Sequence, residues 1–188
     1  MSCKTYNLQQ DFMFSNLFVG LRLQPSCDGQ KVYLFFFGKK PFLSNIHECT
    51  INLDGTIFQS AEQAFQFTKA KFFKNDQVAA NIMTMSNATD IIHAGQKVQR
   101  DAENRKDWEQ HENDVLRKIL RAKFKQNPVL FEMLKSTGST VLVEANPYDR
   151  HFGIGLGMNN HSINCHHNWT GENVIGKLLE EIRSEDEL

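Results

Sequence analysis

A carboxylate, an amide and an ammonium lie along one stripe of the segment 58–71. Glu62, Gln66 and Lys69 occupy positions i, i+4 and i+7, which places their side chains on one face of a helix. A carboxylate can transfer a proton and an amine can attack an electrophilic carbon, so these residue types at this spacing suit a catalytic helix. The alternative is that Glu62 serves only the end of the helix and that Lys69 is a solvated surface lysine.

The local sequence predicts the helix that this stripe requires. Ser60 can cap the first turn and Gln63 fits a capping box, so the helix should begin near residue 61. A neighbouring, mostly apolar stripe would bury the helix against a core, and it consists of Ala61, Ala64, Phe65, Thr68 and Phe72.

A first loop with hydrogen-bonding groups follows a predicted strand and a proline turn at residues 42–45. Ser44 and Asn45 are small polar residues suited to binding ribose hydroxyls. A simple turn that joins two strands is the alternative, because serine and asparagine both stabilise turns.

A second loop, residues 146–157, contains a carboxylate and three glycines at alternate positions. Gly153, Gly155 and Gly157 would let the backbone approach a ligand closely and turn its amides toward an anion. Their spacing differs from the dinucleotide-binding fingerprint, so the phosphate-loop signal is weak. Asp149 is a second candidate carboxylate, and a surface ion pair with its neighbours is the alternative.

A third loop contains four potential metal ligands, but their spacing argues against a metal site. The residues are His161, Cys165, His166 and His167. This spacing matches no usual structural zinc pattern, so we predict a polar loop, with no bound metal and no cofactor.

Composition narrows the possible functions. The 188 residues are 40% hydrophobic with a net charge of -1, which fits a single globular domain and argues against a broad basic surface for duplex nucleic acid. No stretch is long and apolar enough for a membrane span, and residues 1–10 lack a secretory signal. The four cysteines show no disulfide or metal spacing, so we expect reduced thiols in the cytoplasm or nucleus.

The remaining pattern predicts a helix-rich α+β fold with a small, mainly antiparallel sheet, in one domain over residues 1–188. Strands are expected at 32–37 and 140–144, and a hairpin turns at Asp54-Gly55 within 49–58. Further helices are expected at 76–85, 88–95, 107–126, 129–135 and 174–183, whereas residues 1–31 are weakly patterned.

These pieces together resemble the NADAR (YbiA-like) family. The matching blocks recur in order over about residues 33–183: Phe42-Leu43-Ser44-Asn45, Asp54-Gly55, Phe58 to Ala70, Lys106-Asp107-Trp108, Leu120 to Pro128, Leu142 to Ala145, Asp149 with Phe152 to Gly155, and Ile175 to Arg183. Residues 1–31 precede the resemblance as an N-terminal extension.

The resemblance implies an N-glycosidase. Family members act on phosphoribosylamino-pyrimidine intermediates of riboflavin synthesis, and others remove ADP-ribose from guanine. The family's active site maps onto Glu62, Trp108 and Asp149, with Lys69 on the same helix face as Glu62. Ser44, Asn45, Gln66, Phe152, Gly153 and Gly155 are the expected substrate-binding residues. Many relatives have tryptophan where this chain has Phe152, and residues 158–170 form a longer loop, so the substrate can differ.

Chemistry gives these residues roles. Breaking a ribosyl C–N bond builds positive charge on the sugar, so carboxylates such as Glu62 and Asp149 would assist it. Trp108 would stack on the base, or else serve as a core anchor. A nucleophilic Lys69 that forms a Schiff base ranks second to direct hydrolysis.

The expected substrate is ADP-ribosyl-guanine in nucleic acid, and we expect that nucleic acid to be single-stranded. A riboflavin intermediate is the alternative substrate, and a binding module for ADP-ribose without turnover is the alternative from a different class.

Overall fold

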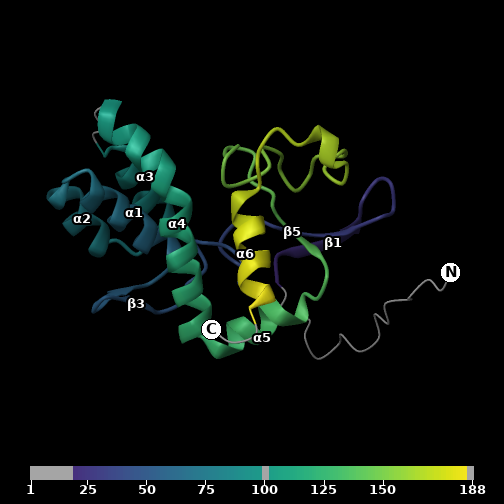
Figure 1. The fold of residues 1–188 in the computed structure, drawn as a ribbon, viewed down its shortest axis with the longest axis horizontal. Helices are drawn as coiled ribbons and strands as arrows, with labels where there is room; N and C mark the ends of the chain where they lie inside the picture. Colours follow the sequence, from purple (N-terminus) through teal and green to yellow (C-terminus); the bar gives the residue numbers. More distant parts are fainter. Residues whose placement is uncertain (1–18, 99–101, 186–188) are drawn as a thin grey trace.

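The computed structural model describes residues 19–98 and 102–185 (Figure 1). Its helices are α1 (Ala61–Phe72), α2 (Asp76–Met83), α3 (Ala88–Gln96), α4 (Ala102–Gln126), α5 (Pro128–Ser136) and α6 (Val174–Ser184), with one 3-10 turn, η2 (His166–Asn168). Its strands are β1 (Leu21–Pro25), β2 (Val32–Phe36), β3 (Ile51–Leu53), β4 (Thr56–Phe58) and β5 (Val141–Glu144). The predicted α+β class is confirmed, whereas Cys3 and residues 1–10 lie outside the described residues.

The strands form two small sheets. β2 is the central strand of the larger sheet, with β1 antiparallel on one side and β5 parallel on the other. β3 and β4 form the predicted antiparallel hairpin, whose turn residues Asp54 and Gly55 have φ of 53° and 88°. The weak pattern of residues 1–31 concealed β1, an edge strand in which Leu23 is 51% exposed.

Both faces of the larger sheet are covered, which explains the uninterrupted apolar run of β2. Leu34 and Phe36 point into the main core beneath the helices, together with Leu142 of β5. Tyr33 and Phe35 point to the opposite face, where the loop 150–170 covers them with Ile154 and Ile163. The carboxyl ends of β2 and β5 therefore lie side by side, and the two loops that follow them meet.

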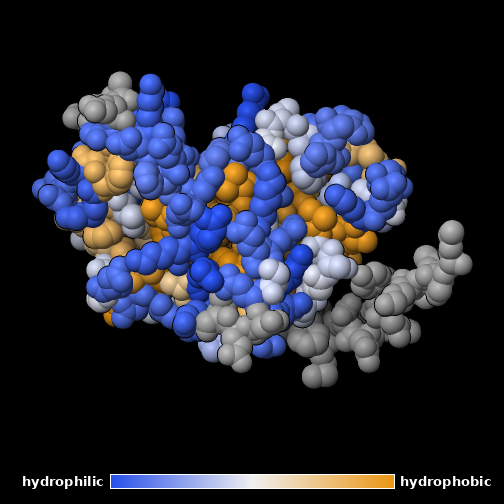
Figure 2. Space-filling view, viewed as in Figure 1, coloured by the Kyte–Doolittle hydropathy of each residue, from blue (hydrophilic) through white to orange (hydrophobic). Residues whose placement is uncertain are grey.

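Helix α1 lies at the centre of the helical half, packed against α2, α3 and α4, while α6 packs on β5 and α4 (Figure 1). Ser60 caps α1, because its Oγ accepts a hydrogen bond from the Gln63 amide at 3.1 Å. The Gln63 side chain accepts from the Gln59 amide, one residue before the cap, and donates to the carbonyls of Ile82, in the last turn of α2, and Met85, just after it. The face of the molecule seen in Figure 2 is mainly hydrophilic, with hydrophobic residues visible between its hydrophilic segments.

Two details of the predicted helices were wrong. Phe72 is 39% exposed, and the core position beyond Ala70 is instead filled by Phe73, which follows the helix. The long helix begins at Ala102 rather than at Asp107, since its first turns are polar and give no apolar periodicity. None of the helices in the described ranges is long and apolar enough to cross a membrane.

Candidate active site

A cavity of about 810 Å³ opens where α1, α3 and α4 meet the loops after β2 and β5. Eight of the ten residues that the sequence suggested line it: Glu62, Asp149, Lys69, Trp108, Ser44, Asn45, Gln66 and Phe152. Gly153 and Gly155 lie outside this lining. A second cavity of about 340 Å³, between the β3–β4 hairpin and α4, contains none of these residues.

The polar stripe of α1 faces this cavity. Gln66 Nε2 donates a hydrogen bond of 2.7 Å to Glu62 Oε1, while the Glu62 amide donates to the Asn45 carbonyl at 2.9 Å. Lys69 is only 8% exposed, so the interpretation as a solvated surface lysine is wrong. Burial raises the pKa of Glu62, as Asp149 also does, whereas the Gln66 hydrogen bond and the Lys69 charge lower it.

The Gln66 side chain depends on a glycine in the neighbouring helix. Its Oε1 is buried, has no hydrogen-bond partner within residues 19–98 and 102–185, and lies against Gly95 of α3. A Cβ atom at Gly95 would come within 1.9 Å of that oxygen and 2.5 Å of the amide carbon, so no larger residue fits beside this rotamer. Gly95 therefore leaves the space in which Gln66 can hold Glu62.

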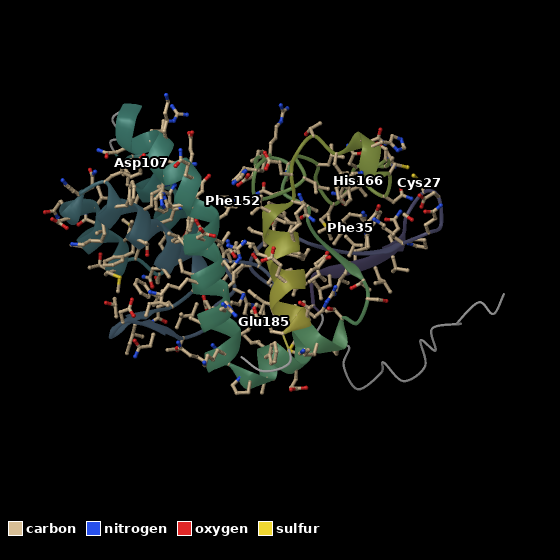
Figure 3. The ribbon with its side chains drawn as sticks, viewed as in Figure 1. Cys27, Phe35, Asp107, Phe152, His166 and Glu185 are labelled. Carbon is tan, nitrogen blue, oxygen red and sulfur yellow. The ribbon has the colours of Figure 1, made fainter. Side chains whose placement is uncertain are left out.

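Asp149 organises its own loop. Its Oδ1 accepts hydrogen bonds from the amides of His151 and Phe152 at 2.9 Å and 2.8 Å. The Asp149 carboxylate is thus anchored by backbone amides at the cavity wall, which differs from the surface ion pair considered as an alternative. Phe152, three residues after Asp149, lies near the N-terminal end of α6 (Figure 3) and packs edge-on against Phe65.

The glycines of this loop have structural positions. Gly153 packs against Asn146 and the backbone of Asp149, and Gly155 has a φ of 69° close to Thr170. The amide of Gly155 donates to the Asp149 carbonyl and that of Ile154 to the Glu144 carbonyl. These amides are therefore used within the loop, and the idea that the turn directs them toward an anion loses its basis.

Trp108 is among the residues that line the cavity, but it is only 2% exposed. Phe65, Phe72 and Phe73 surround its ring at centroid distances of 5.5, 5.3 and 6.0 Å, and its indole N–H donates to Glu112. The environment is that of a core anchor, which leaves little of the ring to stack on a base. Two exposed aromatic rings line the cavity instead: Phe37 is 38% exposed and Tyr148 is 90% exposed.

A buried lysine holds the loop that contains Ser44 and Asn45. Lys123 of α4 is fully buried, and its Nζ donates to the carbonyls of Phe42 and Ser44 at 2.6 Å and 2.8 Å. Burial lowers the pKa of Lys123 to about 8, although the nearby Cys49 and Glu144 oppose this shift. Asn45 Oδ1 is buried without a partner among the described residues.

Sequence reasoning missed two further carboxyl groups at the cavity, Glu144 and Glu112. Glu144 ends β5 and is 6% exposed, and burial together with Asp149 and Glu62 raises its pKa to about 8. Glu112 Oε1 lies 3.4 Å from Nε2 of His151, and burial raises the Glu112 pKa. A carboxylate at the end of the apolar strand Val141–Glu144 was a usable signal, since nothing in such a strand favours a charge.

The histidine-rich loop lies away from the cavity. Cys27 and His166 lie at the same end of the molecule (Figure 3), and η2 begins at His166. Over residues 19–98 and 102–185, no three His, Cys, Asp or Glu side chains are arranged to hold a metal ion.

Comparisons with known proteins agree with the predicted family. A sequence model of the NADAR domain matches residues 29–185, close to the predicted limits of 33–183. The N-glycosidase R617 of Acanthamoeba polyphaga mimivirus is 34% identical over 82% of this chain and 96% of its own length. A riboflavin biosynthesis protein of Vibrio vulnificus is 29% identical over 77% of this chain but only 35% of its own length.

The fold has a solved counterpart. The NMR structure of the Escherichia coli protein YbiA matches with a TM-score of 0.62 and 27% identity, covering 79% of this chain and 82% of that one. In sequence, the N-glycosidase YbiA of E. coli strain K12 is 31% identical over 76% of this chain and 79% of its own length. The domain match, the relatives and the shared fold lead to one conclusion: this chain belongs to the NADAR family.

Proposed function

We propose that this protein is an N-glycosidase that hydrolyses the bond between a ribosyl group and the exocyclic amine of a nucleobase. Relatives named N-glycosidases cover most of the chain at 31% and 34% identity, which supports this enzyme class. The observation that carries the proposal is the pair Glu62 and Asp149 in one cavity, each fixed by hydrogen bonds. Two fixed carboxyl groups suit a reaction that develops positive charge on a sugar.

The two carboxylates have separate tasks in direct hydrolysis. Asp149, anchored by two amides, stabilises the positive charge on the anomeric carbon. Glu62, held by Gln66, takes a proton from the attacking water. In the second route Lys69 attacks the anomeric carbon of the ring-opened sugar and forms a Schiff base, which water later cleaves. The burial of Lys69 in the same cavity gives this route the position that it requires.

ADP-ribosyl-guanine in single-stranded nucleic acid is our leading substrate. The cavity volume of about 810 Å³ is sufficient for a dinucleotide-sized ligand. The exposed rings of Phe37 and Tyr148 offer stacking surfaces for bases at the cavity mouth. With a net charge of -1, the protein has little general attraction to phosphates, so binding should depend on the modified base.

A phosphoribosylamino-pyrimidine of riboflavin synthesis is the second candidate substrate. The similarity to the Vibrio riboflavin biosynthesis protein favours it, although the match covers about a third of that protein. A module that binds ADP-ribose without turnover is a third possibility, and the two fixed carboxylates argue against it.

The test is a base-release assay on the purified protein. One reaction contains a single-stranded oligonucleotide with ADP-ribosyl-guanine, and another contains the phosphoribosylamino-pyrimidine. We expect release of ADP-ribose from the first, and Glu62→Gln should lower kcat by ~100-fold or more without weakening binding. The control is Glu48→Gln, an exposed carboxyl paired with Lys39 away from the cavity, which should leave the rate unchanged.

We also expect ADP-ribose to bind without added metal. ADP-ribose should raise the melting temperature of Glu62→Gln by mass action on the folded state. Binding without turnover by the unaltered protein would identify a binding module, whereas chelator-sensitive activity would contradict the absence of a metal in the reaction.

A further inference from the structure

Both routes of the proposed reaction leave one proton unassigned. When the C–N bond breaks, its electron pair moves onto the base nitrogen, which needs a proton to leave as an amine. Glu62 takes the proton that the attacking water or Lys69 loses, so it cannot give one at the same moment. Asp149 must stay ionised to stabilise the sugar. A separate donor is therefore needed.

The environment of Glu144 differs from that of Glu62 in a way that retains a proton. Burial raises the pKa of both carboxyl groups, but Glu62 also has an amide donor, Gln66, and the nearby Lys69 ammonium, and these two favour its ionised form. Burial raises the pKa of Glu144, and the nearby carboxyl groups of Asp149 and Glu62 raise it further. Lys123 is the cation that lowers the Glu144 pKa, but its ammonium donates its hydrogen bonds to the Phe42 and Ser44 carbonyls.

The position of Glu144 is rigid and reaches the substrate space. It is the last residue of β5, and its backbone amide donates to Asn173 Oδ1 at 3.0 Å while its carbonyl accepts from Ile154 at 3.0 Å. The residue is 94% buried yet lines the cavity beside Asn146 and Asp149. An acid on a strand end keeps its geometry through the reaction better than one on a free loop.

We propose that Glu144 is the catalytic acid that protonates the departing base nitrogen in the N-glycosidase reaction proposed above. The C–N bond breaks, the nitrogen takes the Glu144 proton, and the nucleophile bonds to the anomeric carbon as its own proton passes to Glu62. Exchange of protons with solvent then returns Glu144 to its acid form and Glu62 to its base form. Enzymes commonly use two neighbouring carboxyl groups as acid and base when their environments shift the two pKa values apart.

Glu144→Gln is the decisive variant, because it keeps the size and polarity of the side chain but has no acidic proton. We expect kcat to fall ~100-fold or more while KM changes only a few-fold. Glu144→Asp, which keeps an acid on a shorter side chain, should recover part of the rate. The matched control is Glu180→Gln, since Glu180 accepts from the Leu142 amide of the same strand outside the cavity.

The pH profile gives a readout that a structural role would not change. Activity should decline as the pH rises through about 8, where the Glu144 acid loses its proton. The Lys123 pKa of about 8 titrates in the same range, so the profile of Glu144→Gln separates the two groups. We expect its residual activity to lack this decline; a decline that persists would assign it to Lys123 and overturn the proposal.

Infrared spectroscopy tests the acid without relying on turnover. Wild-type protein at pH 7 should show the carbonyl band of a protonated carboxyl group that Glu144→Gln lacks and that disappears by pH 9. Absence of that difference band would overturn the proposal. A Glu144→Gln variant that cleaves the substrate at the wild-type rate would also overturn the proposed role of Glu144, but the proposed N-glycosidase function would stand. If the wild type cleaves neither substrate, the proposed function itself fails.

Discussion

At the scale of single residues, Lys69 is the side chain whose interpretation the structure changed most. The sequence allowed a solvated lysine, but the residue is 8% exposed in the same cavity as Glu62. A lysine that is removed from water and lies beside a proton acceptor can react as an amine. Burial therefore strengthens the Schiff-base route relative to its ranking from sequence alone.

We expect borohydride to trap a ribosyl adduct on Lys69 during turnover. Reduction converts a Schiff base into a stable amine, so mass spectrometry of peptides should locate the adduct on this residue. Lys69→Arg keeps the charge but cannot form the adduct, and it should lose most of the activity while still binding ADP-ribose. An active wild-type enzyme without any adduct would leave direct hydrolysis as the mechanism.

At the scale of secondary-structure elements, the contact between α1 and α3 supports the site through Gly95. Gly95→Ala should displace the Gln66 side chain and lower kcat ~10-fold or more, because the hydrogen bond to the Glu62 carboxylate is lost. The three atoms nearest to the added Cβ all belong to Gln66. In a Gln66→Ala background, Gly95→Ala should therefore cost no further activity and should stabilise α3 by about 1 kcal/mol.

This double-mutant cycle has a clear negative result. Additive losses of activity would mean that Gly95 acts on the site by some path other than Gln66. Thermal melts of all the variants accompany the kinetics, so that a general loss of stability is not mistaken for a loss of positioning.

Local patterns predicted the elements but not the contacts between them. Helix α1 followed from Ser60 and the periodicity after it, and the β3–β4 hairpin followed from Asp54-Gly55. Of the eight suggested residues that line the cavity, seven come from the polar stripe of α1 and the loops at 42–45 and 146–157, whereas Trp108 of α4 was suggested by the family resemblance. The roles of Gly95 and Lys123 could not be read, since each depends on a residue brought close only by packing.

At the scale of the whole molecule, buried ionisable groups at the site link stability to pH, and Glu144 and Lys123 have large pKa shifts among them. The Glu144 pKa rises from 4.5 to about 8, so between these values the folded state keeps a proton that the unfolded state releases. Stability must then fall as the pH rises through this range. The Lys123 pKa falls from 10.5 to about 8, so stability must rise again between about 8 and 10.5.

We therefore expect a minimum of the unfolding free energy near pH 8. Urea titrations at a series of pH values from 5 to 10 measure it directly. Glu144→Gln removes one of the carboxyl groups whose pKa is raised, so its curve should show a smaller decline between pH 5 and 8, with Glu62 and Glu112 still contributing to it, and keep the rise above 8. A wild-type stability that increases steadily from pH 5 to 8 would contradict the buried acid.

The parallel pairing of β2 with β5 also determines when the enzyme becomes active during its own synthesis. Roughly a hundred residues of chain separate these neighbouring strands, so their pairing must wait until residues 141–144 have been synthesised and must close a long loop. Helix α1 with Glu62 emerges from the ribosome long before Glu144 and Asp149 do. Until β5 docks, the apolar edge of β2 stays uncovered and open to aggregation. Completion of the sheet and completion of the carboxylate set are therefore one late folding event, and a truncated chain that ends before residue 141 can contain α1 but no working site.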